Sequence, residues 1–134
     1  MNGQDFLRIA NEAFVPFLKG LGFVMDELSI SGRFYRVSFT SSAHAVSVSY
    51  EPGDDALFVM VFSRKNGEIS DIDDRTKTPR LADLNSRYMA TVTSEERTEN
   101  EAAFESVVVN DKEERLLLKV AKELRLVLPK YLGS

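Results

Sequence analysis

The chain contains no cysteine and only one histidine, His44, among its 134 residues. The absence of cysteine excludes disulfide bonds, thiolate nucleophiles and zinc sites built from thiolates. A Ser-His-Asp triad would have to include His44, but the serines near it in sequence lie along one chain segment and cannot build a triad. The sequence has no G-x-S-x-G, P-loop or dinucleotide-binding motif. We therefore expect no enzymatic activity, and we expect His44 to be an ordinary polar residue at the start of a strand.

Long hydrophobic runs are also missing. No segment approaches the roughly 20 consecutive apolar residues of a membrane-spanning helix. The first residues, MNGQDFLRIANEAF, carry Asp5 and no basic stretch before an apolar run, which is not the pattern of a signal peptide. Apolar residues make up 43% of the chain and charged residues 28%, an ordinary globular mixture. We therefore expect one domain, residues 1–134, located in the cytoplasm.

The chain carries an excess of acidic residues. The net charge is -4, which argues against binding to nucleic acid, because such binding depends on lysine and arginine that neutralise phosphates. The excess is concentrated in two stretches. Residues 51–74 hold seven acids and two bases, net -5, and residues 91–114 hold eight acids and two bases, net -6. Basic stretches follow each of them, so the charge is segregated along the chain.

Apolar periodicity predicts a helix followed by strands in the first half of the chain. Residues 4–19 have apolar side chains at helical spacing, and we expect Pro16 to bend this helix near its end. Strands are then predicted over three segments, residues 33–40, 44–50 and 56–62. The last segment is apolar at every position, so we expect a central strand covered on both faces, by a later helix or by a partner. The pair Asn66-Gly67 predicts a two-residue hairpin turn that leads into a short edge strand over 68–72.

The side chains of the predicted strands fall into an aromatic and a hydroxyl set. The strand over 44–50 alternates cleanly between apolar and serine positions, as a half-buried antiparallel strand does. The hydroxyl residues Ser38, Thr40, Ser47 and Ser49 are expected on one face, which either is solvated or gives a polar surface on which something docks. We expect core packing for the strand aromatics, which are Phe34, Tyr35, Phe39, Tyr50, Phe58 and Phe62.

Helices are predicted in the second half of the chain. Thr78 and Pro79 are typical of an N-cap and a first helical residue, which predicts a helix over 79–90. Residues 91–99 are polar and are expected to form a loop. Two further helical stretches are predicted. The first covers 100–109, and the second runs from the capping-box pair Asp111 and Glu114 to about 128. Whether 98–128 is one bent helix or two stays open. The whole order predicts an α+β domain with an N-terminal helix, an antiparallel meander of three to four strands, and C-terminal helices packed on the sheet.

The stretch GEISDIDDRTKTPR, residues 67–80, holds four acids within seven positions, at Glu68, Asp71, Asp73 and Asp74. Its spacing resembles the start of a calcium loop, but Arg75 stands at the third ligand position and Thr76 replaces the glycine. We therefore expect no metal and no cofactor. Two interpretations stay open. The stretch is either a solvated loop with ion pairs to Arg75 and Lys77, or part of an acidic surface for a protein partner.

The second interpretation can be stated as a hypothesis about one continuous surface. A fourth strand that returns along the sheet would bring the acids of residues 71–74 back towards the turn at residues 51–55. The predicted partner-binding residues are then Glu51, Asp54, Asp55, Glu68, Asp71, Asp73 and Asp74. Such a surface would attract a basic partner.

One pattern of segments resembles a known class of proteins. Residues 14–84 are similar to small bacterial immunity proteins of polymorphic toxin or contact-dependent inhibition systems. The segments that carry this resemblance are FLKGLGF, then RFYRVSFTSSAHAVSVSYEPGDDALFVMVF, then a polar loop and LADL. The resemblance implies a cytoplasmic protein without enzymatic activity that binds and neutralises a cognate, basic toxin domain. No functional residue is carried over from that class.

The alternative is a protein similar to a type III secretion chaperone, which binds a secreted effector. Those chaperones are also small, acidic α/β proteins, and they dimerise, so a homodimer stays open. Residues 91–111 depart from their pattern, because two further strands would stand there before the last helix. A toxin-like gene immediately upstream would favour the immunity protein, whereas a neighbouring effector and a dimer would favour the chaperone.

Overall fold

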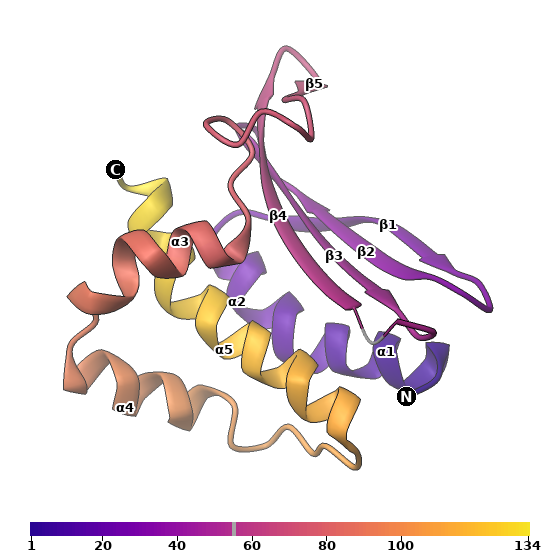
Figure 1. Cartoon of the computed structure of the whole chain (residues 1–134). Coiled ribbons are helices and arrows are strands. Elements are labelled where there is room, and N and C mark those ends of the chain that lie inside the picture. Colours follow the sequence, from indigo (N-terminus) through magenta and orange to yellow (C-terminus); the bar gives the residue numbers. More distant parts are fainter. Residues whose placement is uncertain (55) are drawn as a thin grey trace.

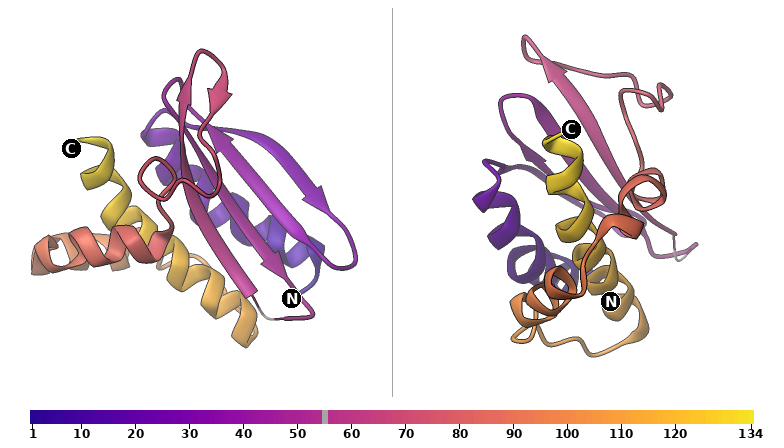
Figure 2. Two further views of the ribbon diagram at one scale, coloured as in Figure 1. Left: turned by 45° about the horizontal axis from the view of Figure 1, so that its top comes forward. Right: turned by 90° about the vertical axis from the view of Figure 1, so that its left-hand side faces the viewer.

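The computed structural model describes residues 1–54 and 56–134 and shows an α+β fold (Figure 1). A curled, five-stranded antiparallel sheet follows an N-terminal helix, and C-terminal helices pack on the sheet. Helices α1, α2 and α5 lie on the same face of the sheet (Figures 1 and 2). The predicted fold class is therefore confirmed. In the described part of the chain, no helix is both long and apolar enough to span a membrane.

The sheet is a meander in which each strand pairs with its neighbours in sequence. Its strands are β1 (Val24–Ile30), β2 (Tyr35–Thr40), β3 (His44–Glu51), β4 (Ala56–Lys65) and β5 (Glu68–Ile69). The turn between β4 and β5 has positive φ at both Asn66 and Gly67, which is the conformation that an Asn-Gly hairpin requires and confirms the predicted turn. Strand β1 was not predicted. Six of its seven residues are exposed, so it lacks the apolar alternation by which half-buried strands are recognised.

The predicted N-terminal helix is present but interrupted. It consists of α1 (Gly3–Ile9), the π-helical turn η1 (Ala10–Phe14) and α2 (Val15–Gly20). Pro16 has no N–H, and in a regular helix its ring would clash with the carbonyl four residues earlier. The wide turn, in which the Val15 N–H donates to the Ala10 carbonyl, removes this conflict. Thus Pro16 affects the helix as predicted, through the turn that precedes it.

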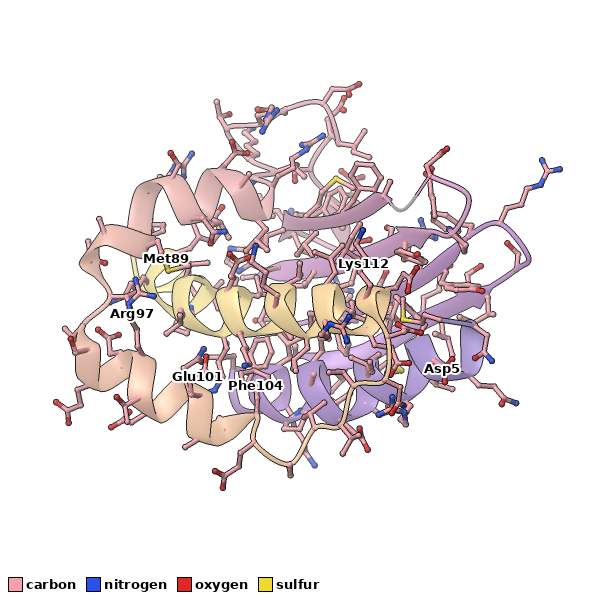
Figure 3. All side chains as sticks on the ribbon, turned by 60° about the horizontal axis from the view of Figure 1, so that its bottom comes forward. Asp5, Met89, Arg97, Glu101, Phe104 and Lys112 are labelled. Atoms are coloured by element: carbon pink, nitrogen blue, oxygen red, sulfur yellow. The ribbon has the colours of Figure 1, made fainter. Side chains whose placement is uncertain are left out.

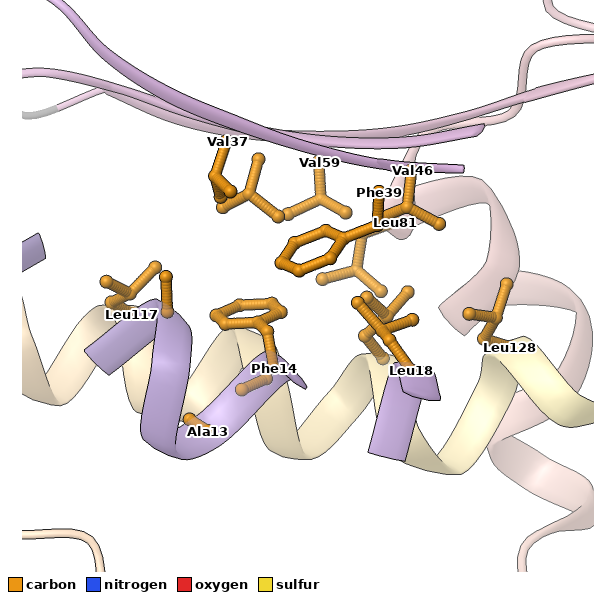
Figure 4. Close-up of a cluster of buried hydrophobic side chains, with 14 of the residues drawn as sticks. Ala13, Phe14, Leu18, Val37, Phe39, Val46, Val59, Leu81, Leu117 and Leu128 are labelled. Atoms are coloured by element: carbon orange, nitrogen blue, oxygen red, sulfur yellow. The ribbon is translucent and has the colours of Figure 1, made fainter. Parts of the chain in front are cut away.

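The core lies between the sheet and the helices (Figure 4). The inward positions of β2 and β3 alternate as the sequence predicted, so Val37, Phe39, Val46 and Val48 are all buried. Phe14 from the N-terminal helix stacks on Phe39, with ring centroids 6.5 Å apart. The helices therefore cover this face of the sheet over β2 and β3, whereas Met25, Leu28 and Ile30 of β1, on the same face, stay partly exposed.

The chain returns to the helix layer beside the edge of β4. The prediction that Thr78 is an N-cap is wrong, because α3 spans Leu81–Tyr88 and its N-cap is Arg80. The Asp83 carboxylate accepts the Arg80 N–H at 2.9 Å. Thr78 is instead fully buried, and its hydroxyl donates to the Asp71 carbonyl. A short 3-10 turn, η2 (Met89–Thr91), continues α3.

Two separate helices complete the chain. Helix α4 (Ser94–Ala103) begins inside the predicted loop, because Thr93 and Glu96 form a capping box. The helix predicted over 100–109 is wrong beyond Ala103, because residues 104–110 are not helical. Helix α5 (Lys112–Leu132) begins where predicted, with the Asp111 side chain accepting the Glu114 N–H. Figure 3 shows α4 lying against α5, with Phe104 at the end of α4. The ring of Phe104 contacts Phe17 edge to face at 6.3 Å, which anchors the end of α4 to the N-terminal helix.

Buried polar groups fix the N-terminal helix to α5. Glu114 is buried and pairs with Arg8, whose guanidinium also donates to Glu12 and to the Val108 carbonyl. Asp111, at the same end of α5, pairs with the N-terminal amino group at 3.1 Å. Because Glu114 is used by Arg8, the reciprocal half of the predicted capping box does not form.

Candidate functional site

The face of the sheet opposite the helices is open. Along β4, Val59 and Val61 point into the core, whereas Phe58, Met60 and Phe62 alternate onto the opposite face. Phe58 is 46% exposed. The prediction that the strand over 56–62 is covered on both faces by helices is therefore wrong within the described residues, and cover by a partner stays a prediction.

Small side chains on β3 make this open face concave. Ala45, Ser47 and Ser49 pair directly with Phe62, Met60 and Phe58 of β4. Ser47 and Ser49 are only 7% and 6% exposed although no described helix lies over them, because the larger side chains of β4 stand beside them. The hydroxyl residues thus form the floor of a groove, instead of the flat or solvated face that was expected.

The opposite wall of the groove comes from β1 and β2. Arg36 donates to Glu27 across the strand pair at 3.1 Å, and its guanidinium lies 5.7 Å from the centroid of the Phe34 ring. Asp26 joins this wall from the irregularity in the pairing of β1. The groove has a volume of about 390 Å³.

Each end of the groove is marked by different residues. Glu51, at the end of β3, lines one end. Ile69 of β5 and Ile72 of the following loop line the other, and they are 56% and 48% exposed. Among the strand aromatics, the prediction of core packing is confirmed for Tyr35, Phe39 and Tyr50. Phe62 is also buried, at 9% exposure, but on the groove face, and the prediction is wrong for Phe34 and Phe58, which line the groove.

The structure does not bring the predicted acidic residues into one cluster. Strand β5 ends after two residues, and the Ser70 N–H donates to the Ser63 carbonyl, so the loop that follows stays at this end of the sheet. Glu51 and the exposed Asp54 lie at the other end, where β3 ends (Figure 1). Asp55 lies outside the described residues. Of the predicted acids that the structure describes, only Glu51 lines the groove.

Within the acidic loop, some carboxylates serve the local fold. Asp74 accepts hydrogen bonds from the Thr76 N–H and hydroxyl, and these bonds, the hydroxyl first, lower the pKa of Asp74. Asp71 accepts the Asp73 N–H. The predicted ion pair of Arg75 is formed with Asp83 of α3, and not with an acid of the loop. Glu68, Asp71 and Asp73 remain exposed.

His44 stands at the start of β3, as predicted, and its ring contacts Tyr131 of α5 edge to face at 5.9 Å. Burial lowers the pKa of His44. In residues 1–54 and 56–134, no three His, Asp or Glu side chains are grouped so that they could hold a metal ion. Comparison with known proteins finds no match to a family model, to a curated protein or to a solved structure.

Proposed function

We propose that this chain is a protein without enzymatic activity that binds a basic protein partner on the open face of its sheet, as an immunity protein binds a toxin domain. The observation that carries this proposal is the outward row Phe58, Met60 and Phe62 on a strand that is apolar on both faces. Phe58 is 46% exposed, whereas Phe62 is only 9% exposed, so the exposed apolar surface of this row lies mainly at Phe58. Such surface costs free energy in water unless another molecule covers it.

The groove offers enough apolar surface to anchor a partner. Phe58, Ile69 and Ile72 each keep about half of their surface exposed. Burying a large apolar side chain fully contributes about 1.5–3 kcal/mol, so covering these three half-exposed residues would contribute a few kcal/mol. Aromatic residues surrounded by well-packed neighbours are frequent hot spots of protein interfaces. Phe58 meets this description, because it pairs with Ser49 at the edge of the groove floor.

The charge of the groove favours a basic partner. Its lining contains three acids, Asp26, Glu27 and Glu51, and one base, Arg36, which already pairs with Glu27. Exposed Glu68 and Asp73 lie beside Ile69 and Ile72, where Lys65 and Lys77 also lie, so the net negative charge comes from the groove lining itself. A basic surface would be attracted and steered towards this face.

The alternative of a secretion chaperone has less support. Residues 91–111, where such a chaperone would carry two more strands, contain helix α4 and no described strand. The departure from the chaperone pattern that the sequence indicated is therefore also a feature of the fold.

The test uses the protein encoded immediately upstream, co-expressed and purified with this chain. Calorimetry should give tight binding to the wild type, and Phe58→Asp should weaken it strongly, whereas Val108→Asp should not. Val108 is a matched control, because it is an exposed apolar residue outside the groove. Growth of cells that express the upstream protein should be rescued by wild type and Val108→Asp only. Undiminished binding by Phe58→Asp would refute the groove, and absence of binding to the upstream protein would refute the immunity assignment.

A second pair of changes tests the acids. Glu68→Lys with Asp73→Lys should leave the fold intact, because exposed charges contribute little to stability. Association with the same partner should become slower and less dependent on salt. If neither the rate nor its salt dependence changes, the acids of this loop are solvated and take no part in binding.

A further inference from the structure

We infer that the segment of the partner that occupies the groove is an α-helix with an apolar stripe and basic residues near the end that lies at Glu51. This inference rests on the proposed function and adds to it the secondary structure and charge of the bound segment. It is drawn from the backbone pairing of the sheet, the cross-section of the groove and the position of its acids.

Backbone pairing favours a helix over an extended segment. The strands β2 and β3 under the groove are each paired on both sides, so their N–H and C=O groups are used within the sheet. The open face therefore presents only side chains. An extended segment lying over Phe58 and Met60 would bury its own backbone polar groups without partners, at about 1–3 kcal/mol for each group. A helix pairs these groups internally.

The edge of the sheet gives an extended partner little opportunity either. Strand β1 is the free edge, and its pairing is irregular between Met25 and Glu27. It also carries the acids Asp26 and Glu27. Bulges and charges on an edge strand are features that oppose the addition of another strand. The groove, and not the β1 edge, is therefore the surface suited to a partner.

The dimensions of the open face fit one helix. Four strands at about 4.8 Å spacing give a face about 14 Å wide between β1 and β4, and a helix with its side chains is about 10–12 Å across. The groove is deepest along β3, because the small side chains of Ala45, Ser47 and Ser49 lie there between larger side chains on both sides. From Ala56, opposite Glu51, to Arg64, opposite Ile69, β4 runs eight residues, or about 26 Å. A helix of about 17 residues has this length.

The acids define where the bound helix should be basic. Glu51 lies at one end of the groove, and Glu68 and Asp73 lie beside Ile69 and Ile72 at the other. The middle of the groove is lined by hydroxyl and apolar side chains from Ser47 and its neighbours. At the Ile69 end, Lys65 pairs across the strands with Glu68, and Lys77 lies beside them, so these bases offset the acids there. Lysine or arginine near the helix end at Glu51, followed by apolar residues at spacings of three and four, matches this arrangement.

A displayed library of random 18-residue peptides can test the inference without knowledge of the partner. Binders are selected on wild-type protein and depleted on Ser47→Arg, in which a long side chain fills the groove floor. Thermal melting checks that Ser47→Arg is folded. We expect the enriched sequences to show apolar residues at helical spacing and an excess of lysine and arginine near one end.

A synthetic copy of the most enriched peptide is then measured directly. Its affinity should fall about ten-fold or more on Phe58→Asp, stay unchanged on Val108→Asp, and weaken with added salt. Its circular dichroism should become helical on binding. Enriched peptides that alternate with a period of two, or that are acidic, would overturn the helical, basic occupant while leaving the groove as a binding site. If no peptide requires Phe58, the inference falls, and binding of the upstream protein then decides whether the proposed function falls with it.

Discussion

Truncating Leu124 should strongly destabilise the protein. Leu124 is fully buried on α5, in the cluster that joins this helix to the sheet, the N-terminal helix and α3. A buried leucine changed to alanine costs about 2–5 kcal/mol, and the cost rises where the surrounding groups cannot collapse into the cavity. Elements pack around Leu124 on several sides, so we expect the upper part of this range, about 3–5 kcal/mol.

This loss can be measured as a shift in melting temperature. For a domain of this size, 1 kcal/mol corresponds to roughly 3–4 °C, so Leu124→Ala should melt about 10–20 °C below the wild type in circular dichroism. Chemical denaturation should show a lower midpoint with the same slope.

The control is Leu116→Ala on the same helix. Leu116 is 37% exposed, so the same truncation there should cost less than about 1 kcal/mol. Alanine is the strongest helix former, so neither change weakens α5 itself. If Leu124→Ala and Leu116→Ala melt at the same temperature, α5 is not part of the core that we describe.

Three further changes test other parts of the fold. Glu114→Ala should lower the free energy of unfolding, measured in urea, by about 1–3 kcal/mol, because it removes the buried carboxylate that pairs with the Arg8 guanidinium. If Glu114→Ala lowers this free energy less than Thr93→Ala does, the pair does not have this role. Thr93→Ala should cost about 1 kcal/mol by removing the cap of α4, and an unchanged midpoint would show that α4 is held by its contacts with α5 alone. Burial lowers the pKa of His44 in the folded protein below its ordinary value of 6.5. As the pH is lowered through and below 6.5, the unfolded chain therefore takes up the His44 proton more readily than the folded protein, and stability should fall. His44→Gln should reduce this fall, and an equal fall in both proteins would exclude His44 as its cause.

Most of the fold follows from local patterns in the sequence. Alternation in residues 44–50 gives the inner face of β3, and Asn66-Gly67 gives the last hairpin. The elements that prediction missed have weak apolar patterns. In β1 the irregularity between Met25 and Glu27 breaks the alternation of Met25, Leu28 and Ile30. Helix α4 is mostly charged and polar, but the capping-box pair Thr93 and Glu96 marks its start, in the same way that Asp111 marks the start of α5.

The site was less accessible to prediction because it depends on the path of the chain. The apolar segment over 56–62 correctly indicated two apolar faces, but not which face the helices would leave uncovered. The adjacency of the two acidic groups depended on the length of β5. Strand β5 ends at Ile69. The hydroxyl of the next residue, Ser70, forms hydrogen bonds with the Lys77 carbonyl and the Thr78 hydroxyl. Such contacts join residues seven or eight positions apart and have no periodic pattern.

One crossing of the chain explains why the groove is open. After the acidic loop, the Pro79 carbonyl accepts the Val61 N–H, and Arg80 bridges to Met60, so the chain passes along the outer edge of β4. Buried Thr78 fixes the start of this passage. The chain then enters α3 on the helix side, and α4 and α5 follow it there (Figure 2). All three C-terminal helices come after this crossing and lie on the helix side of the sheet. The face that carries Phe58 is therefore left open by the described helices, as the binding surface that we propose requires.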